Sequence, residues 1–113
     1  MRANEIRKQF PTYFVKNKMI SQYCPGGALC MYLNNVGISE IKSSYGLWPN
    51  TKSLAGNLQR ANRVLNDEKA LYFATLIINS FDNGYNDESW NWMDIALTWF
   101  NDEGGASYGQ ATC

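Results

Sequence analysis

The C-terminal half of the chain repeats apolar residues at helical spacing. The first such series is Leu54, Leu58, Ala61 and Leu65. Residues at this spacing share one face of a helix, so the series predicts an amphipathic helix whose other faces carry polar residues. Thr51 or Ser53 is its expected N-cap, because a side-chain oxygen there can accept a free N–H of the first turn.

Asn66-Asp67 interrupts this series, and a second one follows. Its apolar members are Ala70, Leu71, Phe73, Ala74, Ile77, Ile78 and Phe81. They fall within an arc of about 160°, which predicts a second helix with one broad buried face. If the Asn66-Asp67 break is a tight turn, the second helix packs antiparallel to the first. If the break is a kink, the two are one long bent helix.

A third helix is predicted over residues 87–101. Asp82-Asn83-Gly84 is a turn signal, and Asn86 or Asp87 can cap a helix that begins near Glu88. The polar positions of this helix occupy only about 80° of its circumference. They are Asn91, Asp94, Thr98 and Asn101. A helix with so wide an apolar arc must be central in the fold or partly covered by another molecule.

The N-terminal half has weaker patterns. Residues 3–9 suit a short helix that Pro11 stops. Residues 12–23 fit a small β-hairpin slightly better than a helix, because β-branched and aromatic residues dominate them. A buried helix is predicted over residues 25–36, with Pro25 in its first turn and Gly37 as its left-handed C-terminal cap. Residues 38–50 read as an irregular connection that Trp48 pins to the core.

These elements predict a mainly α fold, a compact bundle of four or five helices with room for one short β-hairpin near residues 12–23. Residues 1–103 would form a single helical domain. Residues 104–113 are glycine-rich and are expected to be a flexible C-terminal tail.

With 113 residues, 45% of them apolar, the chain is expected to fold as one domain with its own core. It contains no run of about 18 apolar residues, and its N-terminus lacks the pattern of a signal peptide. We therefore expect a cytoplasmic protein without a membrane segment.

Charge is distributed unevenly along the chain, although the formal total is zero. Residues 1–63 carry nine Lys and Arg against two Glu, a net charge of +7. Residues 64–113 carry Lys69 against eight acidic residues, a net charge of −7. The two halves can neutralise each other across one surface, or each can orient a partner of opposite charge.

Catalytic chemistry is sparse, and no cofactor or metal is predicted. The chain has no histidine, which is the commonest general base near neutral pH and the commonest metal ligand. Cys24 and Cys30 lack the spacing of a redox pair or a zinc site, and Cys113 lies in the tail. Residues 82–94 fail the ligand spacing of a calcium loop, because a glycine and a methionine fall on ligand positions. An enzyme is therefore not expected.

Binding through the last helix is the leading functional hypothesis. Trp92 and Trp99 lie about 20° apart on the helical circumference, with Ile95 beside them. We expect this face, together with the acidic Asp94 and Asp102, to bind a protein partner, which includes a second copy of the chain as a homo-oligomer. The alternative is that both tryptophans belong to the core.

Nucleic-acid binding is the competing hypothesis. It would use the basic residues Lys16, Lys18, Lys52, Arg60 and Arg63, of which Arg60 and Arg63 are expected to share a helix face. A net charge of zero argues against a dedicated DNA-binding protein and equally against a DNA mimic.

Two blocks of sequence resemble a family of small bacterial and phage proteins of unknown function, whose members carry W-C-x-x-G-A-L at a helix start and W-N-D before the last helix. The matching positions are Tyr23, Cys24, Gly27, Ala28 and Leu29, then Tyr85, Asn86 and Asp87, with tyrosine in place of both tryptophans. The resemblance implies a small helical domain and no active residues. Thirteen asparagines without a histidine also fit a phage or mobile element. We accordingly expect an accessory protein that occupies a surface on a host protein in the host cytoplasm.

Overall fold

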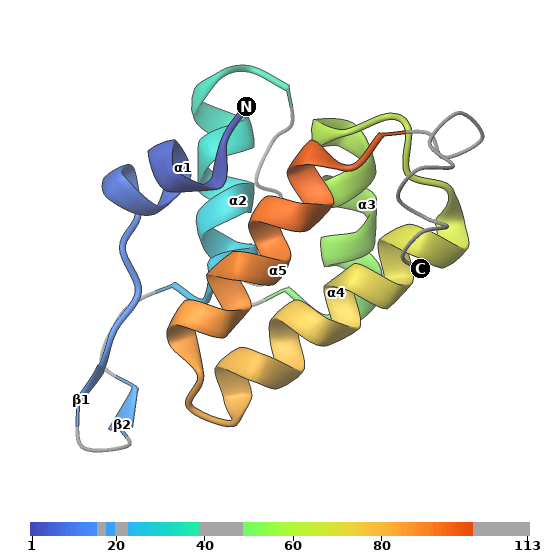
Figure 1. Cartoon of the computed structure of the whole chain (residues 1–113). Coiled ribbons are helices and arrows are strands. Elements are labelled where there is room, and N and C mark those ends of the chain that lie inside the picture. The colour runs from blue at the N-terminus through green and yellow to red at the C-terminus, as the bar shows by residue number, and fades with distance from the viewer. Residues whose placement is uncertain (16–17, 20–22, 39–48, 101–113) are drawn as a thin grey trace.

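Five helices and one pair of two-residue strands make up the described part of the chain (Figure 1). The computed structural model describes residues 1–15, 18–19, 23–38 and 49–100. In chain order the elements are α1 (Ala3–Gln9), β1 (Phe14–Val15), β2 (Lys18–Met19), α2 (Pro25–Asn35), α3 (Thr51–Ala61), α4 (Asp67–Asp82) and α5 (Asn86–Thr98). The prediction of a mainly helical bundle is therefore confirmed.

Helices alone build the layers of this fold. β1 pairs with β2 in antiparallel register, with Phe14 opposite Met19 and Val15 opposite Lys18. Figure 1 shows this pair extending away from the helices at the lower left. So short a ladder offers few cross-strand contacts and is not stable by itself. The hairpin predicted near residues 12–23 is thus not borne out beyond this single pair, and it adds no sheet layer.

The first two helices lie where the sequence predicts them. α1 covers residues 3–9, and α2 carries Pro25 at its first position. Just after α2, Gly37 adopts the left-handed φ of 78° that glycine tolerates best. The N–H of Ile38 then donates to the carbonyl of Leu33 at 2.9 Å, which completes the C-terminal cap.

The start of α3 corrects a prediction. Its N-cap is Asn50 rather than Thr51 or Ser53. Oδ1 of Asn50 accepts the backbone N–H of Ser53 at 2.8 Å, so the amide side chain satisfies a free donor of the first turn.

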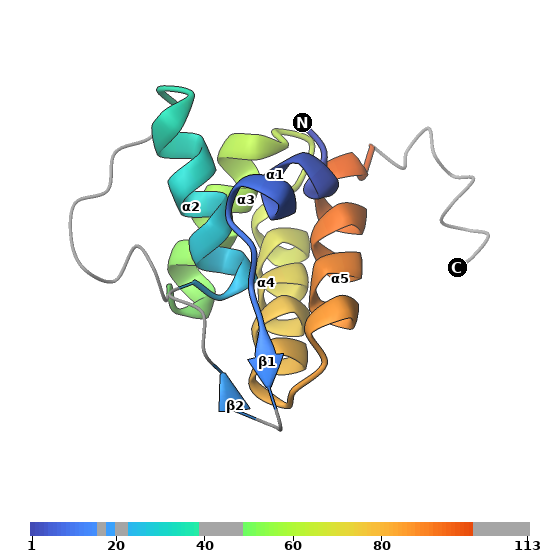
Figure 2. The same cartoon turned by 90° about the vertical axis from the view of Figure 1, so that its left-hand side faces the viewer.

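The break between α3 and α4 is a turn. α3 ends at Ala61, and Asn62 leaves the helix with an extended backbone at φ −141°. Asn66 then caps α4, because its Oδ1 accepts the N–H of Lys69 at 2.7 Å. α4 returns beside α3 (Figures 1 and 2). The antiparallel pair is confirmed and the single bent helix is wrong, and Leu65, expected on the first helix, lies in the turn.

The start of α5 also differs from the prediction. The helix begins at Asn86, and its N-cap residue, Tyr85, makes no side-chain capping bond. Capping by Asn86 or Asp87 is therefore wrong. Both side chains bond to the N-terminal segment instead, Asn86 to Thr12 and Asp87 to Arg7.

α5 ends earlier than expected, at Thr98 rather than at residue 101. The side-chain amide of Asn62 donates to the carbonyl of Ala96 at 3.0 Å and to that of Trp99 at 2.7 Å. Carbonyls at a helix end lack partners within the helix, so this long-range amide satisfies them where the helix stops.

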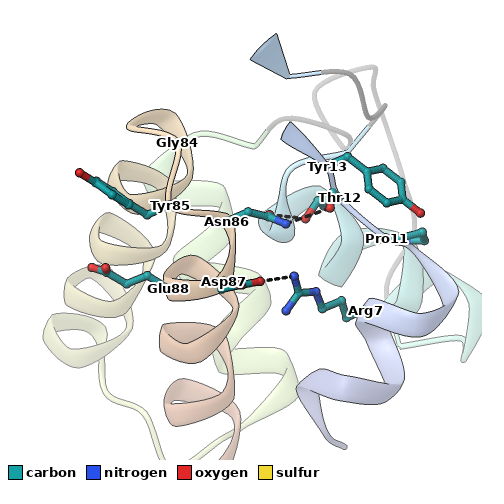
Figure 3. A pocket seen from close by; sticks show the side chains of 9 residues that line it. All are labelled: Arg7, Pro11, Thr12, Tyr13, Gly84, Tyr85, Asn86, Asp87 and Glu88. Atoms are coloured by element: carbon teal, nitrogen blue, oxygen red, sulfur yellow. Dashed lines mark hydrogen bonds and ion pairs between the residues drawn. The ribbon is translucent and has the colours of Figure 1, made fainter. Parts of the chain in front are cut away.

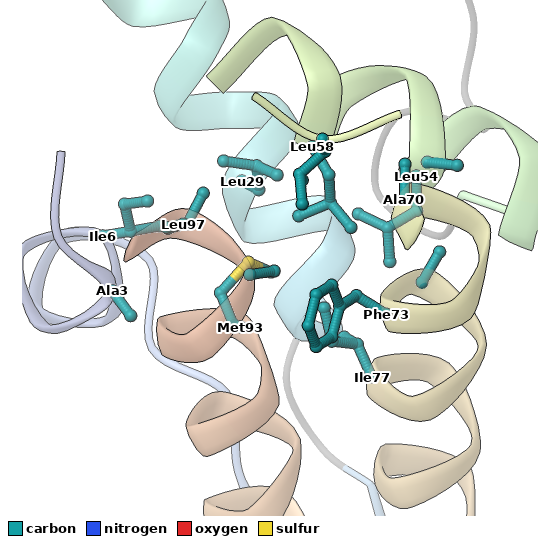
Figure 4. Packing of buried hydrophobic residues seen from close by; sticks show 14 of the residues in the cluster. Ala3, Ile6, Leu29, Leu54, Leu58, Ala70, Phe73, Ile77, Met93 and Leu97 are labelled. Carbon is teal, nitrogen blue, oxygen red and sulfur yellow. The ribbon is translucent and has the colours of Figure 1, made fainter. Parts of the chain in front are cut away.

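The other helices pack around α5, which contacts α1, α2, α3 and α4. Met93, at the middle of α5, is fully buried. In Figure 4 it lies between Ile6 of α1 and Phe73 of α4. The central position predicted for this helix is therefore confirmed.

The longest helix in the described ranges, α4, has 16 residues, whereas a helix that spans a bilayer needs about 20 apolar residues. Accordingly, none of the helices in these ranges has both the length and the apolar character needed to cross a membrane.

Candidate functional site

α5 presents its tryptophans in two different ways. Trp90 is 3% exposed, and its Nε1–H donates to Oγ1 of Thr12 at 2.8 Å. Trp92 follows two residues later, which places it almost on the opposite flank of the helix. Both Trp92 and Trp99 are only partly buried. The wide apolar arc of α5 is therefore core on one side and surface on the other.

Phe73 of α4 forms the floor beneath the two outer tryptophans. Its ring centroid lies 6.3 Å from that of Trp92 and 5.4 Å from that of Trp99. Tilted and edge-on arrangements at these distances are favourable for aromatic rings. Phe73 itself is 2% exposed, so the outer rings cover it and keep part of their own surface in water.

Side chains from both helices continue this feature, which we call the aromatic surface. It comprises Lys69, Tyr72 and Leu76 of α4, Trp92 and Ile95 of α5, and Trp99, which directly follows α5. Tyr72 is 55% exposed and Ile95 is 39% exposed. Nζ of Lys69 lies 4.6 Å from the ring centroid of Trp99, within the range of a cation–π contact. The structure thus places Trp92, Ile95 and Trp99 on one surface and adds residues from α4.

The acidic residues near the aromatic surface divide between two flanks. Glu88 lies one turn before Trp92 and therefore on the same flank, whereas Asp94 lies one turn after Trp90 and faces the side of α1. Both carboxylates are exposed. The predicted Asp102 is outside the described residues. Glu88 borders the aromatic surface, and its four-residue spacing from Trp92 is the signal that could have revealed it. Contact of Asp94 with a partner stays a prediction.

A second feature is an open pocket of about 610 Å³ between the segment after α1 and the start of α5 (Figure 3). Its lining consists of Arg7, Pro11, Thr12, Tyr13, Gly84, Tyr85, Asn86, Asp87 and Glu88. Nη2 of Arg7 donates to Oδ1 of Asp87 at 2.6 Å, and the guanidinium lies 5.7 Å from the ring centroid of Trp90. Arg7 is thus held by a carboxylate and a ring of its own chain.

Hydrogen bonds between Thr12 and Asn86 close the inner side of this pocket. The hydroxyl of Thr12 donates to Oδ1 of Asn86, and Nδ2 of Asn86 donates to the carbonyl of Thr12 at 2.9 Å. The same hydroxyl accepts the indole N–H of Trp90. Because these groups satisfy one another's hydrogen-bonding needs, we interpret the contact beside the pocket as structural. It fixes the N-terminal segment on α5. Sequence reasoning missed it because Thr12 and Asn86 are 74 residues apart.

Cys24 and Cys30 are buried thiols rather than exposed nucleophiles. Burial raises the pKa of both thiols above the ordinary value of 9.0. A thiol that keeps its proton near neutral pH is a poor nucleophile. Sγ of Cys24 accepts the N–H of Gly27 at 3.4 Å, so Cys24 caps α2. Within the described ranges, no three His, Cys, Asp or Glu side chains lie together as a metal site would need.

The basic residues of the alternative hypothesis occupy separate elements. Lys52 and Arg60 are eight residues apart on α3, about 12 Å along its axis. Arg63 lies beyond the end of this helix, so the helix face that it was expected to share with Arg60 does not form. Lys18 belongs to β2, and Lys16 lies outside the described residues. Nucleic-acid binding through these residues stays a prediction. The predicted tail 104–113 and Trp48 are also outside the described residues.

Comparison of the chain with protein-family models, with curated proteins and with solved structures finds no match. The resemblance to small bacterial and phage proteins therefore stays a prediction. The residues themselves must carry the functional argument.

Proposed function

We propose that this chain is a non-enzymatic protein-binding module that docks a partner on the aromatic surface of α4 and α5. The observation that carries the proposal is the partial exposure of Trp92 and Trp99, together with exposed Ile95 and Tyr72, on one continuous flank. Tryptophan and tyrosine are enriched among the residues that carry most of the binding energy of protein interfaces.

The shape and chemistry of the surface favour a protein over a small molecule. Small-molecule sites are concave and bring several polar groups together around the ligand. The aromatic surface instead lies along two neighbouring helices, with an apolar centre and charged residues, Lys69 and Glu88, at its edges. An apolar centre with a polar rim is the usual anatomy of a protein interface.

A substitution at the centre of this surface tests the proposal. Ile95→Lys places a charge where a partner would bury an apolar side chain, and its exposed position lets the variant fold. Val36→Lys is the matched control, because Val36 is similarly exposed, at 48%, but follows α2. The end of α2 and α5 lie on opposite sides of the view in Figure 2.

The wild-type chain and both variants would be used to capture proteins from a lysate of the source organism. We expect wild type and Val36→Lys to retain the same partner and Ile95→Lys to lose it. Retention of one partner by all three proteins would contradict the proposal. Light scattering on the same samples would show whether that partner is a second copy of the chain.

A further inference from the structure

Trp90 and Trp92 of α5 and Trp99, which directly follows it, differ in the cations that accompany them. The guanidinium of Arg7 lies 5.7 Å from the ring centroid of Trp90, and the ammonium of Lys69 lies 4.6 Å from that of Trp99. Among the described residues, no lysine or arginine lies against the ring of Trp92. Yet Trp92 is partly exposed and belongs to the same helix.

A carboxylate stands beside Trp92. Glu88 precedes it by four residues, which puts the two side chains next to each other on the helix surface. Glu88 is exposed and makes no ion pair with any described residue. An indole face next to an unpaired carboxylate is a favourable place for a cationic side chain, because the ring and the carboxylate attract it together.

The charge of the two helices around Trp92 is also negative. α4 and α5 carry six carboxylates against one ammonium, that of Lys69, which lies on Trp99. The carboxylates belong to Asp67, Glu68, Asp82, Asp87, Glu88 and Asp94. α5 itself has no lysine or arginine. Asp87 is already paired with Arg7, and the other five carboxylates still give the helix pair a net negative charge that attracts a basic partner.

We propose that the aromatic surface docks a basic amphipathic helix of a partner protein, with one arginine of that helix on Trp92 and paired with Glu88. This inference rests on the proposed function and names the chemical class of its partner. The apolar side of the partner helix would cover Ile95, Tyr72 and Leu76. A helix is the expected form of the partner segment, because an amphipathic helix can lay its apolar face along two neighbouring helices and present basic side chains at the edge of the contact.

Arginine suits this position better than lysine. Its planar guanidinium can stack on an indole and at the same time donate two hydrogen bonds to a carboxylate. Symmetric docking of a second copy through the same face would instead bring the acidic α5 helices of both copies together. Like charges that meet across an interface oppose association.

Three synthetic peptides test the inference on the full chain. Each is an amphipathic helix of about five turns with the same leucine face, and the positions that flank this face are all arginine, all glutamine or all glutamate. Calorimetry would measure their affinities at low and high salt. We expect the arginine peptide to bind at least about tenfold more tightly than the glutamate peptide, with a gap that narrows as salt rises.

Two matched carboxylate variants and one variant of the ring locate the cation. Glu88→Gln should weaken the arginine peptide about three- to tenfold and leave the glutamine peptide unchanged, because only the arginine loses its carboxylate. Asp94→Asn removes the same charge from the other flank of α5 and should change neither affinity by more than about twofold. Trp92→Leu, which keeps an apolar side chain over Phe73, should weaken the arginine peptide about five- to tenfold. Thermal unfolding would verify that each variant is folded.

Equal weakening by Glu88→Gln and Asp94→Asn would overturn the inference, because binding would then follow total charge alone. Equal affinity for the arginine and glutamine peptides would overturn it as well. If Ile95→Lys abolished binding of both peptides in that case, the docking surface would stand and only the basic character of the partner would be wrong. Failure of all three peptides to bind would also reject the basic helix, while the capture experiment with Ile95→Lys would still decide the proposed function.

Discussion

The two flanks of α5 use tryptophan in opposite ways. On the flank that faces α1, Trp90 is buried, its N–H is bonded to Thr12, and Arg7 lies against its ring. On the flank that faces α4, Trp92 and Trp99 cover Phe73 and still reach water. The first flank is covered by contacts within the same chain, whereas the second leaves part of its aromatic area exposed to water. Contacts, rather than residue type, therefore separate the buried Trp90 from the partly exposed Trp92 and Trp99.

The largest expected difference between the flanks is in stability. Trp90→Ala should lower the free energy of unfolding by about 3–5 kcal/mol, because it leaves a cavity and removes one of the two hydrogen bonds of the Thr12 hydroxyl. Trp92→Ala should cost at least about 1 kcal/mol less, since part of that ring is already in water. Urea unfolding of both variants gives these values, and equal losses would contradict the difference in burial between Trp90 and Trp92.

A smaller effect is expected from the hydrogen bonds on the flank of α5 that faces α1. Thr12→Val removes the hydroxyl that joins Trp90 to Asn86 and keeps the shape of the side chain. The variant should lose about 1–3 kcal/mol of unfolding free energy, because buried polar groups remain unpaired. Thr98→Val is the matched control, since the hydroxyl of Thr98 is exposed and bonds within its own helix, to the carbonyl of Asp94 at 2.8 Å. If both variants were equally stable, the contact between the N-terminal segment and α5 would not depend on the Thr12 hydroxyl.

On the flank of α5 that faces α4, Lys69→Met tests the contact between Lys69 and Trp99. The variant keeps an apolar stem of similar length and removes the charge, so it should lose about 0.5–1 kcal/mol. Lys52→Met, at an exposed position in the first turn of α3, should have almost no effect. An equal loss of unfolding free energy in both variants would mean that the effect comes from removing any positive charge and not from the contact with the Trp99 ring.

The smallest expected effect concerns the surface ion pair between Arg7 and Asp87. Asp87→Asn should cost less than about 1 kcal/mol, because the Asp87 side chain is 87% exposed and the pair is screened by salt. Glu88→Gln removes a carboxylate from the same helix end without this ion pair, so the difference between the two variants measures Arg7. We expect this difference to shrink at high salt, and a difference that persists there would contradict the account.

Local signals in the sequence were sufficient for most of the fold. Pro25 and Gly37 mark the ends of α2, because one residue lacks an N–H and the other tolerates a left-handed backbone. The repeat that begins at Leu54 and the break at Asn66 located α3 and α4. These features depend on neighbours within a few residues, which is why a single sequence contains them.

Contacts between distant residues account for the errors. Asn86 was a reasonable N-cap, but Thr12 engages its amide from 74 residues away. α5 stops at Thr98, where Asn62 satisfies carbonyls at the helix end. The end of the helix therefore depends on tertiary packing.

The same limit applies to the candidate site. Helical spacing fixes the relative direction of Trp92 and Ile95, so the sequence could place these two on one face. Trp99 follows the end of α5, and its place beside them depends on its contact with Phe73. Sequence reasoning could not tell that α4 would lie against this flank and add Tyr72 and Lys69. Nor could it tell that Asp94 would face α1 while Glu88 borders the tryptophans.

The indole N–H signals of Trp90, Trp92 and Trp99, recorded by NMR while the captured partner is added, would show which flank of α5 the partner contacts. We expect the signals of Trp92 and Trp99 to shift or broaden as the partner binds, whereas that of Trp90, bonded to Thr12, stays in place. A partner that moves the signal of Trp90 and leaves those of Trp92 and Trp99 unchanged would contradict docking on the aromatic surface.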